Sequence, residues 1–226
     1  METNNFYLST MMIEAPRTGR DFVPDGDLGK EPWSTISRTT FETSYTPAQH
    51  YPEARTQIAV SWSPAWLYIA FWSRYTGLNV YPDGESSGRK WELWMRDVVE
   101  VFINPFPEKP LRYFEFEVAP NNQWIDLAID LNQTPIQDAA WSSGFLHSTR
   151  LDEESRLWVC EMGIPVSTMG VEEVREGMKW RINFYRCDGP GDDTERRFLA
   201  WSPTFEKNFH VPARFGEILF VGDGSA

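Results

Sequence analysis

Three glutamates in the middle of the chain have the spacing that most suggests chemistry. Glu115 and Glu117 stand two positions apart in RYFEFEVAP, so on a β-strand both project from one face, roughly 7 Å apart. Glycosidases use two carboxylates about 5–10 Å apart, although a solvated strand face or pairing with a cation explains the same spacing. Glu100 lies in DVVEVFINP with the parity of Val98 and Phe102. A carboxylate among such apolar neighbours lies on a concave, partly open sheet face or is paired beneath it.

Other groups that enzymes use are scarce. The three histidines are His50, His147 and His210, and His147 has no second histidine at metal-ligand spacing. The sequence contains no Gly-x-Ser-x-Gly element, phosphate-binding loop or dinucleotide fingerprint. We therefore expect a protein without catalytic activity.

Aromatic residues give the main indication of ligand binding, with 11 Trp, 8 Tyr and 15 Phe in 226 residues. Trp91 and Trp94 lie in RKWELWMRD, just before a predicted strand, and Phe209 and His210 lie in the predicted loop FEKNFHVP. A sugar ring stacks its C–H face on such rings, while its hydroxyls need fixed donors and acceptors. The alternative is that these rings only cover the end of the fold.

Acidic turns provide candidate calcium ligands. DGPGDD contributes Asp188, Asp192 and Asp193, and DGD contributes Asp25 and Asp27. Calcium favours oxygen-rich loops of this kind, whereas most acidic turns are simply solvated. No cofactor other than this calcium is expected from the residues themselves.

The charge excludes several partners. Lys plus Arg is 21 and Asp plus Glu is 33, which gives a net charge of −12. Nucleic acids and anionic membranes both require a basic surface, so neither is an expected partner. No stretch is long and apolar enough for a membrane-spanning helix, and no secretory signal peptide is visible. Cys160 and Cys187 both lie in predicted strands, where buried free thiols or a disulfide are the alternatives.

The elements that must position these residues are mostly strands. Short apolar or alternating runs separated by turn signals predict about ten strands and an all-β fold. The predicted strands are Thr56–Ser63, Ala65–Arg74, Asp97–Pro105, Arg112–Pro120, Gln123–Asp130, Gly144–Leu151, Arg156–Pro165, Lys179–Asp188, Arg197–Pro203 and Phe215–Val221.

Helix is predicted only as one or two short turns within Ser167–Glu176. The first 54 residues are expected to be irregular, with residues 1–23 forming an N-terminal extension. We predict one domain over residues 1–226, a two-sheet antiparallel β-sandwich, and expect a monomer.

The order of several motifs resembles carbohydrate-binding module family 9, within the wider group of DOMON-like β-sandwiches. The segments that carry the resemblance are DGDLGKEPW (Asp25–Trp33), SWSPAWLYIAF (Ser61–Phe71), WMRDVVEVFINP (Trp94–Pro105), VCEMGIP (Val159–Pro165) and AWSPTFEKNFHVPARFGEILF (Ala200–Phe220). They span most of the chain, and their order is more specific than any one of them.

The resemblance implies a jelly-roll-like sandwich that binds a plant-type glycan such as xylan, or its chain end, in polysaccharide catabolism. The family's first stacking Trp matches Trp94, its acceptor carboxylate matches Glu100, and its second stacking aromatic falls on Phe209. A basic sugar-contacting residue of the family falls near Glu117, and an Asn falls near Glu206. An extracellular or periplasmic location is expected on the same ground.

Two other functions compete with carbohydrate binding. Some DOMON-like sandwiches bind haem for electron transfer, and Met95, Met162, His147 and His210 would be candidate axial ligands here. The second competing function is that of a xylanase-like glycoside hydrolase, because family 9 modules accompany xylanases.

Overall fold

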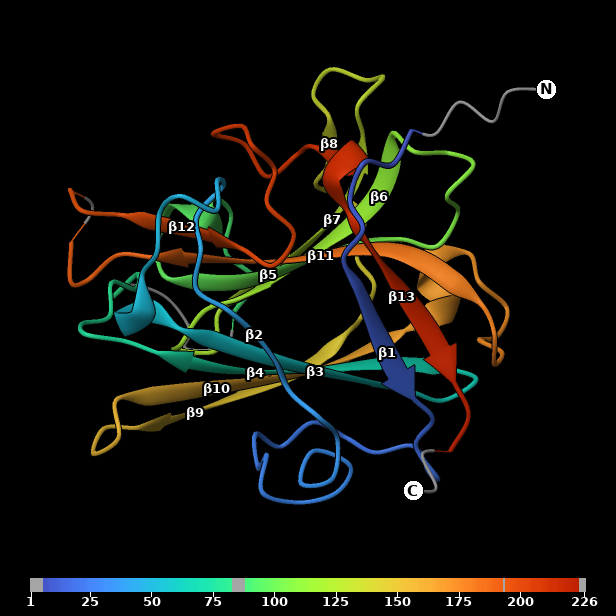
Figure 1. The fold of residues 1–226 in the computed structure, drawn as a ribbon, viewed down its shortest axis with the longest axis horizontal. Coiled ribbons are helices and arrows are strands. Elements are labelled where there is room, and N and C mark those ends of the chain that lie inside the picture. Colours follow the sequence, from blue (N-terminus) through green and yellow to red (C-terminus); the bar gives the residue numbers. More distant parts are fainter. Residues whose placement is uncertain (1–5, 83–87, 193, 224–226) are drawn as a thin grey trace.

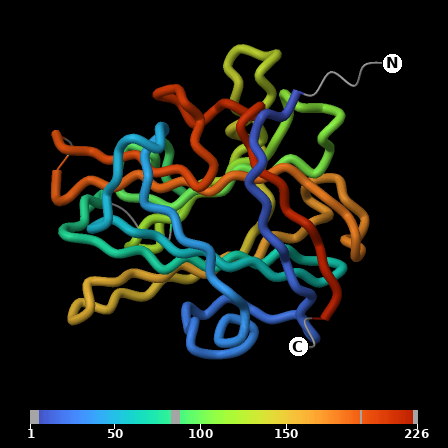
Figure 2. Tube along the Cα trace, viewed as in Figure 1, coloured from blue at the N-terminus to red at the C-terminus, as the bar shows by residue number. Residues whose placement is uncertain are grey.

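The computed structural model describes residues 6–82, 88–192 and 194–223, and their strands form two packed sheets (Figures 1 and 2). The smaller sheet contains, in spatial order, β2 (Thr39–Phe41), β3 (Thr56–Trp62), β4 (Trp66–Arg74), β10 (Leu157–Pro165) and β9 (Leu146–Asp152). The larger sheet contains β1 (Met12–Pro16), β13 (Gly216–Val221), β11 (Lys179–Asp188), β5 (Val98–Asn104), β6 (Arg112–Val118), β7 (Trp124–Asp130) and β8 (Gln137–Asp138), with β12 (Arg197–Ala200) also paired to β11. The all-β sandwich predicted from the sequence is confirmed.

Strand pairing is antiparallel except at one edge of the larger sheet. There β1 runs parallel to β13, with Ile13 opposite Ile218, and the two strands lie side by side in Figure 1. In the described residues helix is limited to four 3-10 turns: η1 (Pro52–Ala54), η2 (Leu93–Met95), η3 (Val166–Met169) and η4 (Pro212–Arg214). The helical segment expected within Ser167–Glu176 is therefore a single turn at its beginning.

The N-terminal region contains more structure than expected. Residues 1–23 were predicted as an irregular extension, but Met12–Pro16 forms β1, and Thr39–Phe41 forms β2 in the region expected to be irregular up to residue 54. In β1 the buried side chains Ile13 and Ala15 alternate with exposed ones. The strand is short and ends in proline, so its pattern is too brief to recognise, and its hydrogen bonds come from a strand about two hundred residues later.

The two faces of β5 pack into two different apolar clusters. Val99, Val101 and Ile103 belong to the main core between the sheets, because alternate side chains of a strand project to opposite faces. Val98 and Phe102 belong to a second apolar cluster on the outer face of the larger sheet. Burial on both faces explains why β5 reads as an almost continuous apolar run.

The outer face of the larger sheet is covered by two loops. The connection from β12 to β13, red in Figure 1, rises on the side away from the smaller sheet and contributes Phe209 and Phe215 to the second cluster. The segment after β2 reaches the same region, where Ser44 bridges to Leu199 and the Ala200 N–H donates to Thr43 O at 3.0 Å. This crossing brings Tyr45 beside β12.

Candidate functional site

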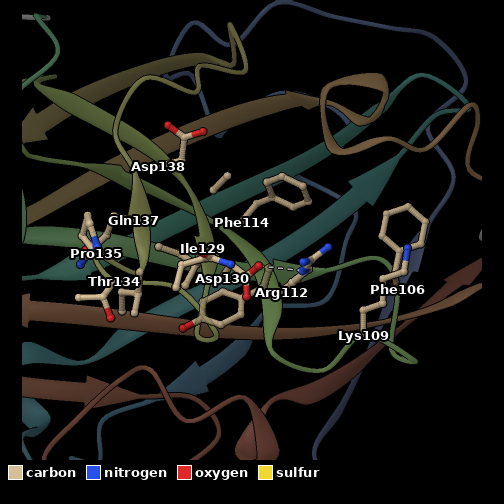
Figure 3. Close-up of a pocket in the computed structure, with 14 residues that line it drawn as sticks. Phe106, Lys109, Arg112, Phe114, Ile129, Asp130, Thr134, Pro135, Gln137 and Asp138 are labelled. Carbon is tan, nitrogen blue, oxygen red and sulfur yellow. Dashed lines mark ion pairs between the residues drawn. The ribbon is translucent and has the colours of Figure 1, made fainter.

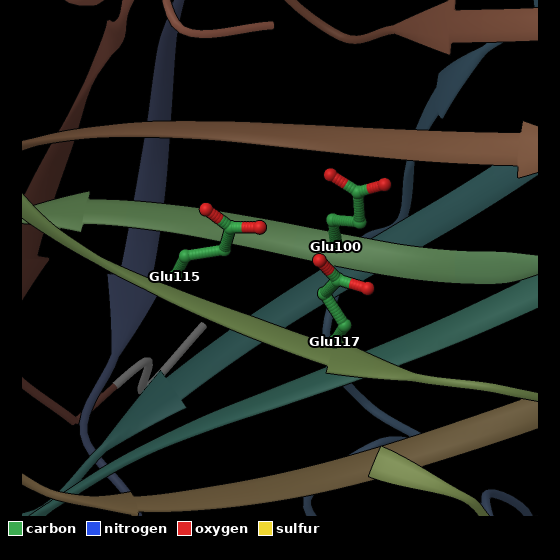
Figure 4. Close-up of side chains that lie close together, drawn as sticks. All are labelled: Glu100, Glu115 and Glu117. Carbon is green, nitrogen blue, oxygen red and sulfur yellow. The ribbon is translucent and has the colours of Figure 1, made fainter. Parts of the chain in front are cut away.

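Glu100, Glu115 and Glu117, here called the carboxylate trio, lie together on the outer face of the larger sheet. Glu100 on β5 is directly opposite Glu117 on β6, and Phe102 is opposite Glu115. The parity of the two strands therefore places all three carboxylates on one face, and one oxygen of each lies within 4.8 Å of one oxygen of the others (Figure 4). The sequence prediction that Glu115 and Glu117 share a face is confirmed.

The trio is buried, so a solvated strand face, one of the two explanations considered for Glu115 and Glu117, is wrong. Glu100 and Glu115 are almost completely buried and Glu117 is 0% exposed. The Cys187 thiol donates to Glu100 Oε1 at 3.1 Å. Glu115 Oε2 and both carboxylate oxygens of Glu117 accept no hydrogen bond from the rest of the described chain. Three acids thus share a small volume with few compensating donors.

Burial dominates the electrostatics of the trio. It raises the pKa of Glu100 to about 8, with a further increase from the nearby Glu115 carboxylate and opposing effects of Cys187 and Arg196. Burial also raises the pKa of Glu117 well above its usual range, and the Glu100 charge acts in the same direction. Desolvation and like charge both disfavour the ionised form, which explains the sign of each shift.

A cleft of about 320 Å³ opens above the trio. Glu100 and Glu115 line it, whereas Glu117 lies beneath them and does not. The other lining residues are Tyr45, Trp94, Met95, Phe102, Gln137, Cys187, Arg196, Phe198, Lys207, Asn208, Phe209 and His210. The cleft combines aromatic rings with carboxylate, amide, ammonium and guanidinium groups.

One side of the cleft is a packed group of aromatic rings. Phe209 stacks on Tyr185 with ring centroids 4.1 Å apart and an interplanar angle of 15°. Tyr45 lies 5.3 Å from Phe209 and stacks on Phe198 at 5.6 Å. Phe209 is only 9% exposed, while Tyr45 and Phe198 are half-buried. One face of the Phe209 ring is therefore occupied by Tyr185, and the ring offers little free surface.

Trp94 comes from the η2 turn that precedes β5. Leu93 beside it is fully buried in the second cluster and anchors the turn, while Trp94 is half-buried. Trp91, 47% exposed, packs edge-on against Trp94 with centroids 5.2 Å apart. Arg196 binds the turn from the other side, donating from Nη2 to the carbonyls of Trp94 and Arg96. The turn is thus held in position from both sides.

The remaining predicted binding residues are distributed around the cleft. His210 lines it, and its Nδ1 forms a hydrogen bond with the Tyr113 hydroxyl at 2.6 Å. Glu206 is exposed and does not line the cleft, but Lys207 and Asn208 do. The structure therefore brings Trp94, Glu100, Phe209 and His210 together, and leaves Glu206 and Trp91 outside.

Sequence reasoning did not select several residues of the cleft. Tyr45 comes from the segment after β2, Arg196 directly precedes β12 and Phe198 lies in β12, and no local pattern shows that these segments meet. Asn208 carried a local signal, because it stands directly before the loop aromatic Phe209.

The acidic turns have partners within the protein. Asp188 is buried and its two oxygens accept from Arg186 and Arg197. Asp25 pairs with Lys30 at 2.5 Å, which together with the Asp27 amide lowers the pKa of Asp25.

Asp27 accepts from the Gly29 N–H at 3.1 Å, and Asp192 from Thr194 at 2.8 Å. Asp193 lies outside the described residues. Among those described, the trio is the only group of three potential ligands close enough to share an ion, so calcium at the turns stays a prediction.

A second pocket, of about 740 Å³, lies at the β6–β7–β8 edge of the same sheet (Figure 3). Arg112 and Asp130 form an ion pair at 2.9 Å within it, and Phe106 and Phe114 supply aromatic surface. Gln137 lines both this pocket and the cleft. The two openings therefore adjoin each other.

The fold and the cleft together define a class of protein. A two-sheet sandwich with a concave opening of aromatic and polar side chains is a ligand-binding module. Comparison with known proteins specifies the class: the profile of the family described as "Carbohydrate family 9 binding domain-like" matches residues 24–223. The chain belongs to this family.

Solved structures support the fold. A proposed carbohydrate-binding protein from Bacteroides uniformis ATCC 8492 superposes with a TM-score of 0.74 and 20% identity, covering 94% of this chain and 100% of that one. A family 9 module from Caldicellulosiruptor kristjanssonii in complex with glucose gives a TM-score of 0.70 at 16% identity, covering 96% and 98%. A family 9 module from Caldicellulosiruptor kristjanssonii in complex with cellotriose gives a TM-score of 0.70 at 16% identity, covering 95% of this chain and 96% of that one.

A curated relative shares part of its sequence with this chain. It is named "Extracellular protein", from Arthroderma benhamiae, and is 30% identical over 141 residues. The match covers 58% of this chain and 63% of the relative's length.

Family membership decides between the competing classes. Family 9 domains are carbohydrate-binding modules without catalytic activity, so this chain is a binding module and not an enzyme. Of the candidate haem ligands, Met162 is buried in the core between the sheets, whereas Met95 and His210 line the cleft. None of the helices in the described residues has the length and apolar character needed to cross a membrane.

Proposed function

We propose that the chain binds a plant-type glycan, or its chain end, in the cleft above the carboxylate trio. The observation that carries the proposal is the composition of the cleft, where the half-buried Trp94 ring lies in the same opening as the Glu100 carboxylate. A sugar needs an aromatic face for its C–H groups and fixed acceptors for its hydroxyls. Both requirements are met within about 320 Å³, a volume suited to one or two sugar units.

Trp94 is the proposed stacking platform. Tyr45, Phe198 and Phe209 also line the cleft, and their packed rings add apolar surface to it. Around the opening, Lys207 and Asn208 are exposed and can exchange hydrogen bonds with hydroxyls. The family 9 complexes with glucose and cellotriose support the choice of ligand class.

Two further points belong to the same proposal. The relative named as an extracellular protein supports an extracellular location, where plant polysaccharides are degraded. The large negative charge fits a neutral polymer as ligand better than an anionic one.

Isothermal titration calorimetry with xylotriose and cellotriose tests the proposal. One or two stacked sugar units should bind with about −4 to −8 kcal/mol, a dissociation constant between millimolar and micromolar. Trp94→Ala should abolish this binding. Trp66→Ala is the matched control, because Trp66 is also a half-buried Trp but lies on β4 of the smaller sheet. Equal affinity of wild type and Trp94→Ala would show that the sugar binds elsewhere.

A further inference from the structure

The carboxylate trio is buried without a positively charged partner in the described part of the chain. Within the described residues, no Lys or Arg forms an ion pair with Glu100, Glu115 or Glu117. The nearest cationic influence is Arg196, which acts on Glu100 but donates its Nη2 to backbone carbonyls. Buried carboxylates normally lie against a cation or accept several hydrogen bonds.

Unpartnered oxygens provide a second, separate observation. Glu117 is fully buried, and no described residue outside the trio donates a hydrogen bond to either of its oxygens or to Glu115 Oε2. In Figure 4 both side chains project from β6, beside Glu100 on the adjacent β5. One oxygen from each of the three lies within 4.8 Å of the others. Two oxygens on opposite sides of one calcium ion lie about 4.8 Å apart, because each calcium–oxygen bond is about 2.4 Å long.

We propose that Glu100, Glu115 and Glu117 form a binding site for a calcium ion at the base of the cleft. The donor set selects a hard cation, because all three ligands are carboxylates. Zinc prefers imidazole or thiolate, and the neighbouring Cys187 thiol is engaged with Glu100 Oε1. Magnesium demands near-ideal octahedral geometry and usually binds through only one or two carboxylates, whereas calcium accepts several carboxylates in a flexible shell.

The site is reachable and has room for further ligands. Glu100 and Glu115 line the open cleft, so an ion can enter from solvent and keep coordination positions facing the opening. This site is distinct from the acidic turns, whose carboxylates already accept bonds from Arg, Lys or backbone groups. Its existence does not depend on sugar binding, so it is tested without sugar.

Calorimetry with calcium chloride on EDTA-treated, dialysed protein is the direct test. The wild type should bind one calcium ion per chain, with a dissociation constant of about 1 mM or tighter, the range of extracellular modules. Glu117→Gln keeps the side-chain shape and should weaken binding at least about tenfold, because calcium affinity follows the number of charged ligands. Asp192→Asn is the matched control in an acidic turn and should leave binding unchanged.

A second measurement locates the ion in the wild type, so the test does not rely on a variant folding. Manganese(II) in place of calcium should broaden backbone amide signals in Val98–Asn104 and Arg112–Val118 by its paramagnetism. Broadening centred on residues 188–192 would overturn the proposal. So would the absence of any calcium heat at about 1 mM, or equal calcium affinity of the wild type and folded Glu117→Gln.

Discussion

Replacing Phe209 separates two roles for the aromatic side of the cleft. If Phe209 holds the other rings in place, its loss should first reduce stability, whereas a stacking platform would chiefly affect sugar affinity. Its ring is 9% exposed and stacks at 4.1 Å on Tyr185, with Tyr45 at 5.3 Å and Phe198 at 6.1 Å. We therefore expect packing to be its main contribution.

The magnitude follows from the area buried. A phenylalanine side chain buries on the order of 150 Å², which at about 25 cal/mol per Å² gives about 4 kcal/mol. Phe→Ala substitutions in cores cost about 3–5 kcal/mol. Because Phe209 borders an open cleft, water can enter the space left by its ring, so we expect about 3 kcal/mol for Phe209→Ala.

Urea denaturation followed by tryptophan fluorescence measures this loss. Phe205→Ala is the control in the same loop, and because Phe205 is 54% exposed its replacement should cost less than about 1 kcal/mol. Phe209→Leu keeps most of the apolar volume, so it should cost less than about 1.5 kcal/mol and leave sugar affinity nearly unchanged. A Phe209→Leu variant of normal stability that no longer binds sugar would refute the packing role and identify Phe209 as a platform.

Two other predictions concern stability. Glu161 accepts hydrogen bonds from the Asp25 and Gly26 amides and from Trp33 Nε1, at 2.7, 2.9 and 2.7 Å. Glu161→Gln should therefore lower the unfolding free energy by about 2–4 kcal/mol. An unchanged midpoint of urea denaturation would contradict this prediction. Burial lowers the pKa of His147 to about 4, so the unfolded chain takes up the proton first and stability should fall as the pH decreases from about 6.5 to about 4. His147→Asn should reduce the loss of unfolding free energy between about pH 7 and about pH 5 by about 1–3 kcal/mol, as measured by urea denaturation at the two pH values. An equal loss in the wild type and the variant would exclude His147 as the cause.

Local pattern was sufficient to predict most of the sandwich. The central strands carry apolar runs of strand length bounded by turn residues, and observed limits such as Lys179–Asp188 agree with the predicted ones. The strands that were missed are short edge strands. Gln137–Asp138, for example, is a two-residue β8 whose pairing depends on β7 and not on its own sequence.

The resemblance motifs predicted more than ligand contacts. The turn at Asp25 and Gly26, the Trp33 indole and Glu161 come from two separate motifs, and the structure joins them through the three hydrogen bonds to Glu161. These residues close the N-terminal segment onto the smaller sheet. A motif shared by a family therefore marks folding requirements as well as binding groups, and only the structure distinguishes them.

Parity explains both what was predictable about the site and what was not. The alternation of β5 and β6 placed Glu100, Glu115 and Glu117 on one face, and the register that sets Glu100 opposite Glu117 brings them into contact range. Burial of that face could not be read from the strands, because it results from the loops that carry Tyr45 and Phe209. These loops exclude water from three carboxylates that would otherwise form a solvated surface, and they leave the cluster without a positively charged partner. The proposal of a cation at this position therefore depends on the tertiary fold, whereas the sequence alone pointed to the acidic turns.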